Sequence, residues 1–171
     1  MNDAVTTRHG ADLDRSDEWD EIRERHLKST GERPASYARG VHHVALLSSD
    51  VERTIRFYQD LLGFPLTEVF ENRDYQGSTH FFFDIGNGNA LAFFDFPGLE
   101  LGSYSEVLGG LHHLALSMPE DRWEEVRKRL DAAGIASANI SGSSLYFNGP
   151  DGERIELISD PLGEMYGQAV M

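Results

Sequence analysis

The sequence predicts an α+β fold built from two βαβββ modules. The first observation behind this prediction is a repeated phrase. Val41-His42-His43-Val44-Ala45-Leu46 returns as Leu111-His112-His113-Leu114-Ala115-Leu116, 70 positions later. The second observation is a set of matched glycines that follow the helical stretches (Gly63 and Gly134) and precede the last strands (Gly88 and Gly152). A repeat in this register indicates two equivalent halves.

The segment before the repeat is expected to be an appendage. Residues 1–12 are polar and are expected to be disordered. Residues 13–29 carry a thin apolar stripe and predict a helix, with Ser16 as a candidate cap and Glu21 and Arg25 as an ion pair one turn apart. A flexible stretch at 31–34 then leads into the first module.

Each module reads as strand, helix and three strands. The first is expected to have strands at about 41–48, 64–71, 79–85 and 90–96 and a helix at 51–62. Ser49 with Glu52 has the spacing of a capping box at the start of that helix, and Asp50 competes as the cap. The second is expected to have strands at about 111–117, 135–140, 143–148 and 153–159 and a helix from Pro119 to Ala133.

These elements predict three regions. The first is an N-terminal extension over 1–39, and the second is the paired-module domain over 40–160, with modules at about 40–97 and 110–160. The third is a C-terminal tail over 161–171. The two modules are expected to pair within one chain or to swap between two chains.

Composition excludes several classes of function. The formal net charge of −14 repels nucleic-acid phosphates and anionic membranes. The absence of cysteine excludes disulfides, thiolate metal sites and cysteine nucleophiles. The N-terminus is polar and acidic, unlike a signal peptide, and no apolar run approaches the roughly 20 residues that span a bilayer. We therefore expect a soluble cytoplasmic protein that binds neither nucleic acid nor membranes.

Strand alternation separates the paired histidines into two sets. His43 shares a face with Ala45 and Leu47, whereas His42 shares the other face with larger aliphatic residues. In the second phrase His113 shares its face with the small Ala115 and Ser117. The face with small residues leaves room for a ligand, which assigns His43 and His113 to a pocket. The alternative is that these histidines are structural, or that His42 and His112 face the pocket.

The candidate carboxylate is Glu156, which lies between two aliphatic residues in the last strand of the second module. An unpaired carboxylate is costly to bury, so a metal ion is a natural partner, although an edge-strand surface position is the alternative. Two histidines and one carboxylate form the triad that non-haem Fe(II) favours, and Mn²⁺, Zn²⁺ or Ni²⁺ can take similar ligands. The equivalent position in the first module is Ala92, so no fourth protein ligand is expected there.

These phrases together resemble the vicinal oxygen chelate superfamily, which includes glyoxalase I, extradiol dioxygenases, fosfomycin-modifying thiol transferases and bleomycin-binding proteins. The resemblance covers roughly residues 40–160 and also rests on Phe57-Tyr58 with Gly63-Phe64 and on Gly149-Pro150-Asp151-Gly152. It implies that the two modules form a cupped mixed sheet around a divalent metal, which is held by His43, His113 and Glu156 and binds two adjacent oxygens of a substrate. Ala92 departs from the four-ligand pattern of glyoxalase I.

The His/His/Glu pattern resembles that of extradiol dioxygenases and of fosfomycin thiol transferases, and the first resemblance implies a metal-dependent dioxygenase with Fe(II). A glyoxalase-like lyase or isomerase, a thiol transferase and a non-enzymatic drug-binding protein are the alternatives. By the same resemblance Tyr146 is a candidate acid/base. His80, which aligns with Ser144 in the repeat, could shuttle protons near the metal or be a partly exposed structural histidine. Phenylalanines at 81–83, 93, 94 and 96 predict an apolar or aromatic small-molecule substrate. A homodimer is expected, because related scaffolds pair.

Overall fold

A computed structural model describes residues 14–171. The chain divides into two compact units, one comprising residues up to Arg39 together with Met171 and the other comprising Gly40–Val170. The disorder expected for residues 1–12 falls outside the described residues. No helix within residues 14–171 is long and apolar enough to cross a bilayer.

The N-terminal unit contains a short helix without a buried face. Helix α1 (Ser16–His26) is followed by the 3₁₀ turn η1 (Thr30–Glu32), and neither contains a buried residue. The expected pair of Glu21 and Arg25 is confirmed at 3.5 Å. The expected Ser16 cap is wrong, because the helix begins at Ser16 and the Ser16 amide donates to the Asp14 carboxylate.

The first module forms a four-stranded sheet in the order β1-β4-β3-β2. Its elements are β1 (His43–Leu47), α2 (Val51–Ile55), the π-helical turn η2 (Arg56–Leu61), β2 (Leu66–Glu71), β3 (Thr79–Asp84) and β4 (Ala90–Phe94). Strand β1 pairs with β4 in parallel, and the other pairs are antiparallel. Within the described residues β1 pairs only with β4, so its second edge is free.

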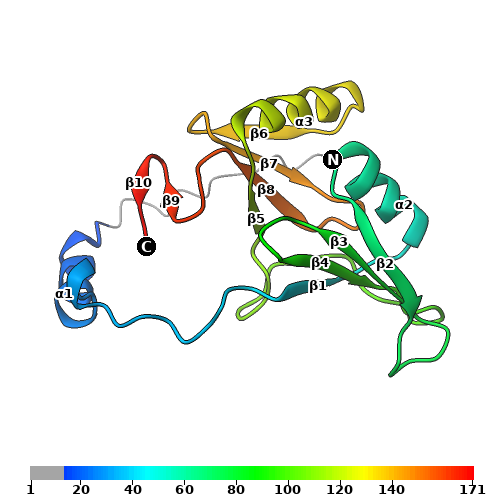
Figure 1. Ribbon diagram of the computed structural model, residues 1–171, viewed down its shortest axis with the longest axis horizontal. Coiled ribbons are helices and arrows are strands. Elements are labelled where there is room, and N and C mark those ends of the chain that lie inside the picture. Colours follow the sequence, from blue (N-terminus) through cyan, green and yellow to red (C-terminus); the bar gives the residue numbers. More distant parts are fainter. Residues whose placement is uncertain (1–13) are drawn as a thin grey trace. The chain divides into compact units, whose positions relative to one another are not determined.

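The second module repeats this order as β5-β8-β7-β6. Its elements are β5 (Leu114–Ser117), α3 (Glu120–Ala132), β6 (Ser137–Ile140), β7 (Ser144–Asn148) and β8 (Arg154–Ile158). Ala45 pairs with Ala92 in the first sheet, and Ala115 pairs with Glu156 in the second. Ala92 and Glu156 are therefore equivalent positions, and the predicted fold of two βαβββ modules is confirmed (Figure 1).

The helix ends follow the sequence signals closely. Asp50 is the N-cap of α2 and accepts a hydrogen bond from the Arg53 amide at 2.9 Å, so it prevails over the Ser49 capping box. Gly63 and Gly134 follow the two helices with φ of +82° and +70°. This left-handed conformation, which glycine adopts without strain, explains why both helices end there.

One hydrophobic core joins the two modules. It takes aromatic and aliphatic side chains from both sheets, from α3 and from η2. A polar contact also crosses between the modules, since the buried Tyr58 hydroxyl of η2 donates to the Glu153 carboxylate at 2.7 Å. A Cβ added at Gly149 would lie 2.0 Å from that carboxylate, so the glycine makes room for the contact.

The C-terminal tail contains structure that the sequence analysis did not anticipate. Strands β9 (Glu164–Met165) and β10 (Gln168–Ala169) form an antiparallel hairpin, drawn in red in Figure 1. The two-residue turn between them consists of Tyr166 and Gly167, which both have positive φ. Such turns match the twist of a hairpin, but they favour asparagine and glycine, so a tyrosine gives no turn signal in the sequence.

Candidate metal centre

Two of the three predicted ligands lie together on the second module. Nε2 of His113, the residue just before β5, lies 3.0 Å from Oε2 of Glu156 on β8. Glu156 is only 2% exposed, and both neighbours along its strand are fully buried. Among residues 14–171 the His113 imidazole is the only ion-pair partner of this carboxylate. A buried carboxylate with so little compensation is a site where a cation would lower the free energy.

Tyr146 completes this cluster from the adjacent strand. It is the register partner of Glu156 in the β7–β8 ladder, and its ring centroid lies 5.6 Å from that of His113. Burial raises the pKa of the Tyr146 phenol, and a hydrogen bond to Glu156 together with the negative charge of Glu156 raises it further. The phenol therefore keeps its proton at neutral pH and can donate it to a neighbouring anion.

His43 lies on the corresponding face of the first module. His43, Ala45 and Leu47 are exposed, whereas Val44 and Leu46 pack against the core, as the strand alternation predicts. His43 does not join His113 and Glu156 within one chain. Among the described residues, no group of three histidine, cysteine, aspartate or glutamate side chains is placed to hold a metal ion. The three predicted ligands are thus divided into one histidine and one histidine–glutamate pair.

His80 lies beside His43 on the same sheet face. Its ring stacks on Phe94 with centroids 3.8 Å apart, and its Nε2 atom is buried without a hydrogen-bond partner. Burial lowers the pKa of His80, and the nearby His43 lowers it further. A neutral imidazole with an unused polar atom is available to a group that approaches this face.

Each candidate histidine ligand contacts the histidine that precedes it in the sequence. Nδ1 of His42 lies 2.8 Å from Nδ1 of His43, and Nδ1 of His112 lies 2.6 Å from Nδ1 of His113. Each contact engages Nδ1 of the candidate ligand and leaves its Nε2 for other partners. Such hydrogen bonds set the tautomer and orientation of a metal-binding imidazole.

Arg154 is a residue of this site that the sequence analysis missed. It lies two positions before Glu156 on β8, and its guanidinium is 5.2 Å from the centre of the Tyr146 ring. It also forms an ion pair with Glu106 at 3.1 Å. The two-residue spacing from Glu156 was the available signal, since residues i and i+2 of a strand share a face.

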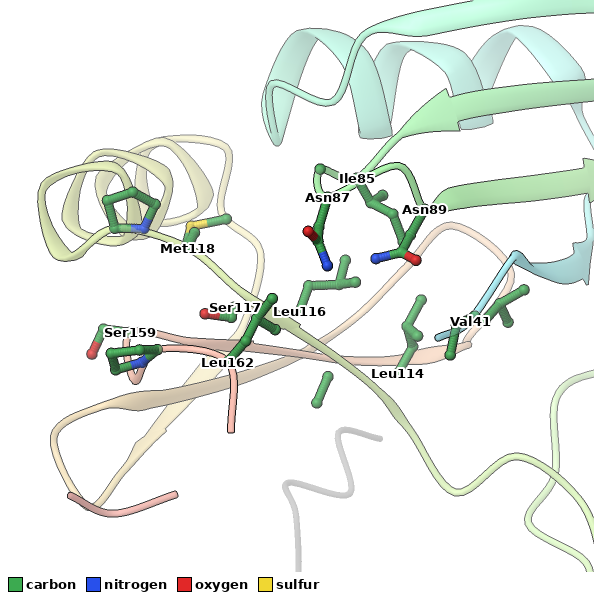
Figure 2. Close-up of a pocket in the computed structure, with 15 residues that line it drawn as sticks. Val41, Ile85, Asn87, Asn89, Leu114, Leu116, Ser117, Met118, Ser159 and Leu162 are labelled. Atoms are coloured by element: carbon green, nitrogen blue, oxygen red, sulfur yellow. The ribbon is translucent and has the colours of Figure 1, made fainter. Parts of the chain in front are cut away.

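An apolar pocket of about 550 Å³ adjoins the second module at the free edge of β5. Ala115 and Ser117 line it and belong to the His113 face of that strand. Figure 2 shows Asn87 and Asn89 across the pocket from Leu114 and Leu116. His113, Tyr146 and Glu156 do not line this pocket, so Ala115 and Ser117 are its link to the sheet face of the candidate centre.

The donor set fits a divalent metal ion. Imidazole nitrogen and carboxylate oxygen are the ligands that Fe(II), Mn²⁺ and Zn²⁺ take in proteins. The buried Glu156 supplies negative charge, and Ala92 offers no competing ligand at the equivalent position. Two imidazoles and one carboxylate would leave coordination positions open for a substrate.

Similar proteins include enzymes with two kinds of named activity. The chain is 28% identical over 142 residues to "Putative ring-cleaving dioxygenase MhqA" of Bacillus subtilis, covering 77% of this chain and 43% of that protein. It is 26% identical over 120 residues to "Glutathione transferase FosA" of Serratia marcescens, covering 68% and 78%. The chain thus spans less than half the length of the ring-cleaving relative.

Comparison of folds gives the same scaffold. A glyoxalase family protein from Enterococcus faecalis superimposes with a TM-score of 0.58 at 27% identity, covering 72% of this chain and 100% of that one. The sequence profile of the glyoxalase/bleomycin resistance protein/dioxygenase superfamily matches residues 40–157. This match spans both modules and most of the chain, and the protein accordingly belongs to that superfamily.

Proposed function

We propose that this protein is a divalent-metal-dependent enzyme that binds its substrate through two adjacent oxygens, and that its reaction is an extradiol-type ring cleavage. The observation that carries the proposal is the buried Glu156 carboxylate, which is paired with His113 and Tyr146. The small side chain of Ala115 lies next to it on the same sheet face. A purely structural carboxylate at this depth would be expected to have a permanent cation or several amide donors.

The third ligand in this proposal is His43 of a second copy of the chain. His43 lies on an exposed sheet face at the start of β1, and His113 lies just before β5. Each of these two strands has a free edge among the described residues. Two copies related by a twofold axis, with the first module of each beside the second module of the other, would bring each His43 to the other copy's His113 and Glu156. The functional unit is then a homodimer with two identical centres.

Each side chain has a defined part in this reaction. His43, His113 and Glu156 hold the ion, and His42 and His112 orient the two imidazoles through their Nδ1 atoms. The bound ion would polarise the two substrate oxygens and lower their pKa. Tyr146 keeps its proton at neutral pH and donates it as negative charge develops on the substrate, while His80, neutral at that pH, is the alternative proton carrier.

The aromatic residues beside His43 favour a flat, apolar substrate. Phe82 stacks against Phe70 at 5.7 Å, and His80 stacks against Phe94, so the face around His43 is lined with rings. Phe70 is 45% exposed, which leaves part of this surface open to a ligand. Rings of this kind bind an aromatic ligand by stacking, and the likeness to a protein named as a ring-cleaving dioxygenase supports the same substrate class.

A thiol transferase is the second candidate, because FosA matches this chain over 78% of its own length. The electrostatics of the site favour the dioxygenase. Arg154 lies over the Tyr146 ring, and its charge is already balanced by Glu106. A small anionic substrate would therefore find little free positive charge at this centre.

Metal content and oxygen consumption test the proposal. Protein purified without added metal and then loaded with Fe(II) is expected to bind one ion per chain and to consume oxygen with catechol. Glu156→Gln should lose most of the bound metal, because glutamine keeps the size but removes the charge that stabilises a cation between neutral imidazoles. Glu120→Gln, on the exposed first turn of α3, is the matched control and should keep it. Full metal occupancy in Glu156→Gln would refute the proposed centre.

A further inference from the structure

Among residues 14–171, three hairpin turns place a residue other than glycine at positive φ, followed by glycine. They are Asn87-Gly88, Ser141-Gly142 and Tyr166-Gly167, and the first residue of each pair has a φ of 53° to 57°. Asparagine is one of the few side chains that adopt this conformation readily, and a bulky aromatic residue there is an outlier. Tyr166 is therefore held in a backbone conformation that glycine would adopt with less strain.

The Tyr166 turn is tied to the face that carries His113. Ser117, which shares that face of β5, donates its hydroxyl proton to the Asp160 carbonyl at 2.6 Å. The Asp160 carboxylate in turn accepts a hydrogen bond from the Tyr166 amide. Pro161 and Leu162, which lie between Asp160 and Tyr166 in the sequence, line the apolar pocket in Figure 2. Ser117 lies two positions along β5 from Ala115, the register partner of Glu156, so the hairpin is anchored on the sheet face that also carries Glu156.

The Tyr166 side chain is free to meet a ligand. It is 55% exposed, and within residues 14–171 its hydroxyl makes no hydrogen bond. The hairpin also lies beyond residues 40–157, the part of the chain that matches the superfamily.

From these observations we infer that Tyr166 is a substrate-contacting residue, presented by the strained β9–β10 turn to cover the His113–Glu156–Tyr146 cluster. This inference rests on the proposed function and extends it with a contact from outside the two modules. The ligand class is a flat aromatic diol, which binds between the Tyr166 ring and the cluster. Strain at a residue that contacts a ligand persists when the surrounding structure holds it in place, as the Asp160 hydrogen bond does here.

Tyr166→Gly separates a binding role from a structural one. Glycine suits both positions of the turn, so the thermal midpoint is expected to stay constant or rise. The affinity of the Mn²⁺-loaded protein for 4-methylcatechol, measured by calorimetry, should fall about fivefold, in line with the loss of one aromatic contact. Ser141→Gly is the matched control, because it relieves the same conformation in the β6–β7 turn and should leave affinity unchanged.

A second measurement needs no ligand. Nitration of Tyr146 by tetranitromethane, followed by peptide mass spectrometry, should be faster in Tyr166→Gly than in the wild type or in Ser141→Gly. Equal affinity and equal nitration in both glycine variants would overturn the covering role, even in a protein that loads metal. A wild-type protein that binds metal but no 4-methylcatechol would overturn the substrate contact, and a protein that binds no metal would overturn the proposed function itself.

Discussion

At the scale of single residues, the site depends on how each polar atom is compensated. Glu156 has one imidazole and one phenol as partners in a buried position, whereas Glu153, at a similar depth, receives the Tyr58 hydroxyl and the Asp151 amide. The Glu153 carboxylate therefore accepts two hydrogen bonds from the protein, whereas the Glu156 carboxylate has fewer donors for its depth. This difference distinguishes a structural glutamate from a candidate metal ligand three residues away.

Tyr146→Phe should reduce the turnover number with catechol by about a hundredfold or more, because general acid–base catalysis contributes on that scale. Metal content should stay at the wild-type level, since the phenol is not a ligand in the proposed centre. Steady-state kinetics alongside metal analysis checks both statements. His80→Gln is the companion variant, and a larger loss of turnover there than in Tyr146→Phe would assign the proton transfer to His80.

The sequence predicted which sheet face each strand residue of the site occupies, because side chains alternate between the two faces of a strand. That rule placed His43 opposite the core-facing Val44 and aligned Ala92 with Glu156. It could not show that His43 stands apart from His113 in one chain, because the arrangement of the two modules depends on tertiary packing. Tyr166 also escaped prediction, since a tyrosine in a left-handed turn contradicts local preference.

At the scale of elements, the modules are joined by buried contacts as well as by the chain. The hydrogen bond from Tyr58 of η2 to Glu153 before β8 is made in the interior, beside Gly149. Burial raises the pKa of Glu153, against the lowering effect of the hydrogen bonds that it accepts. Ionisation of Glu153 therefore costs more in the folded protein than in the unfolded chain.

This raised pKa predicts a pH-dependent contribution to stability. Because the folded pKa lies above the unfolded value, the contribution is complete below the ordinary glutamate pKa and is lost as pH rises through the folded pKa. Between about pH 4 and about pH 7 the wild type should lose more stability than Glu153→Gln, which has no proton to release. Urea unfolding of both proteins across this range gives the difference. Parallel pH profiles would show that Glu153 ionises without penalty.

At the scale of the whole molecule, each module presents half of a centre. The first offers His43 and the aromatic face around His80, and the second offers His113, Glu156 and Tyr146. Both β1 and β5 keep one free edge, and exposed edges of parallel strands are usually covered. An assembly of two chains would cover the edges and complete the centres together, which makes assembly a condition for activity in the proposed function.

Mixing two defective variants tests this arrangement directly. His43→Ala lacks the ligand of the first module, and His113→Ala lacks a ligand of the second, so each protein alone should bind little metal. If each centre takes ligands from two copies, a mixed dimer contains one centre with all three ligands intact. Unfolding and refolding the two variants together should then restore about a quarter of the wild-type metal content and activity, because half of the dimers are mixed and each has one complete centre. If His43 instead serves its own chain, no centre regains all three ligands, and the refolded mixture should be as inactive as its components.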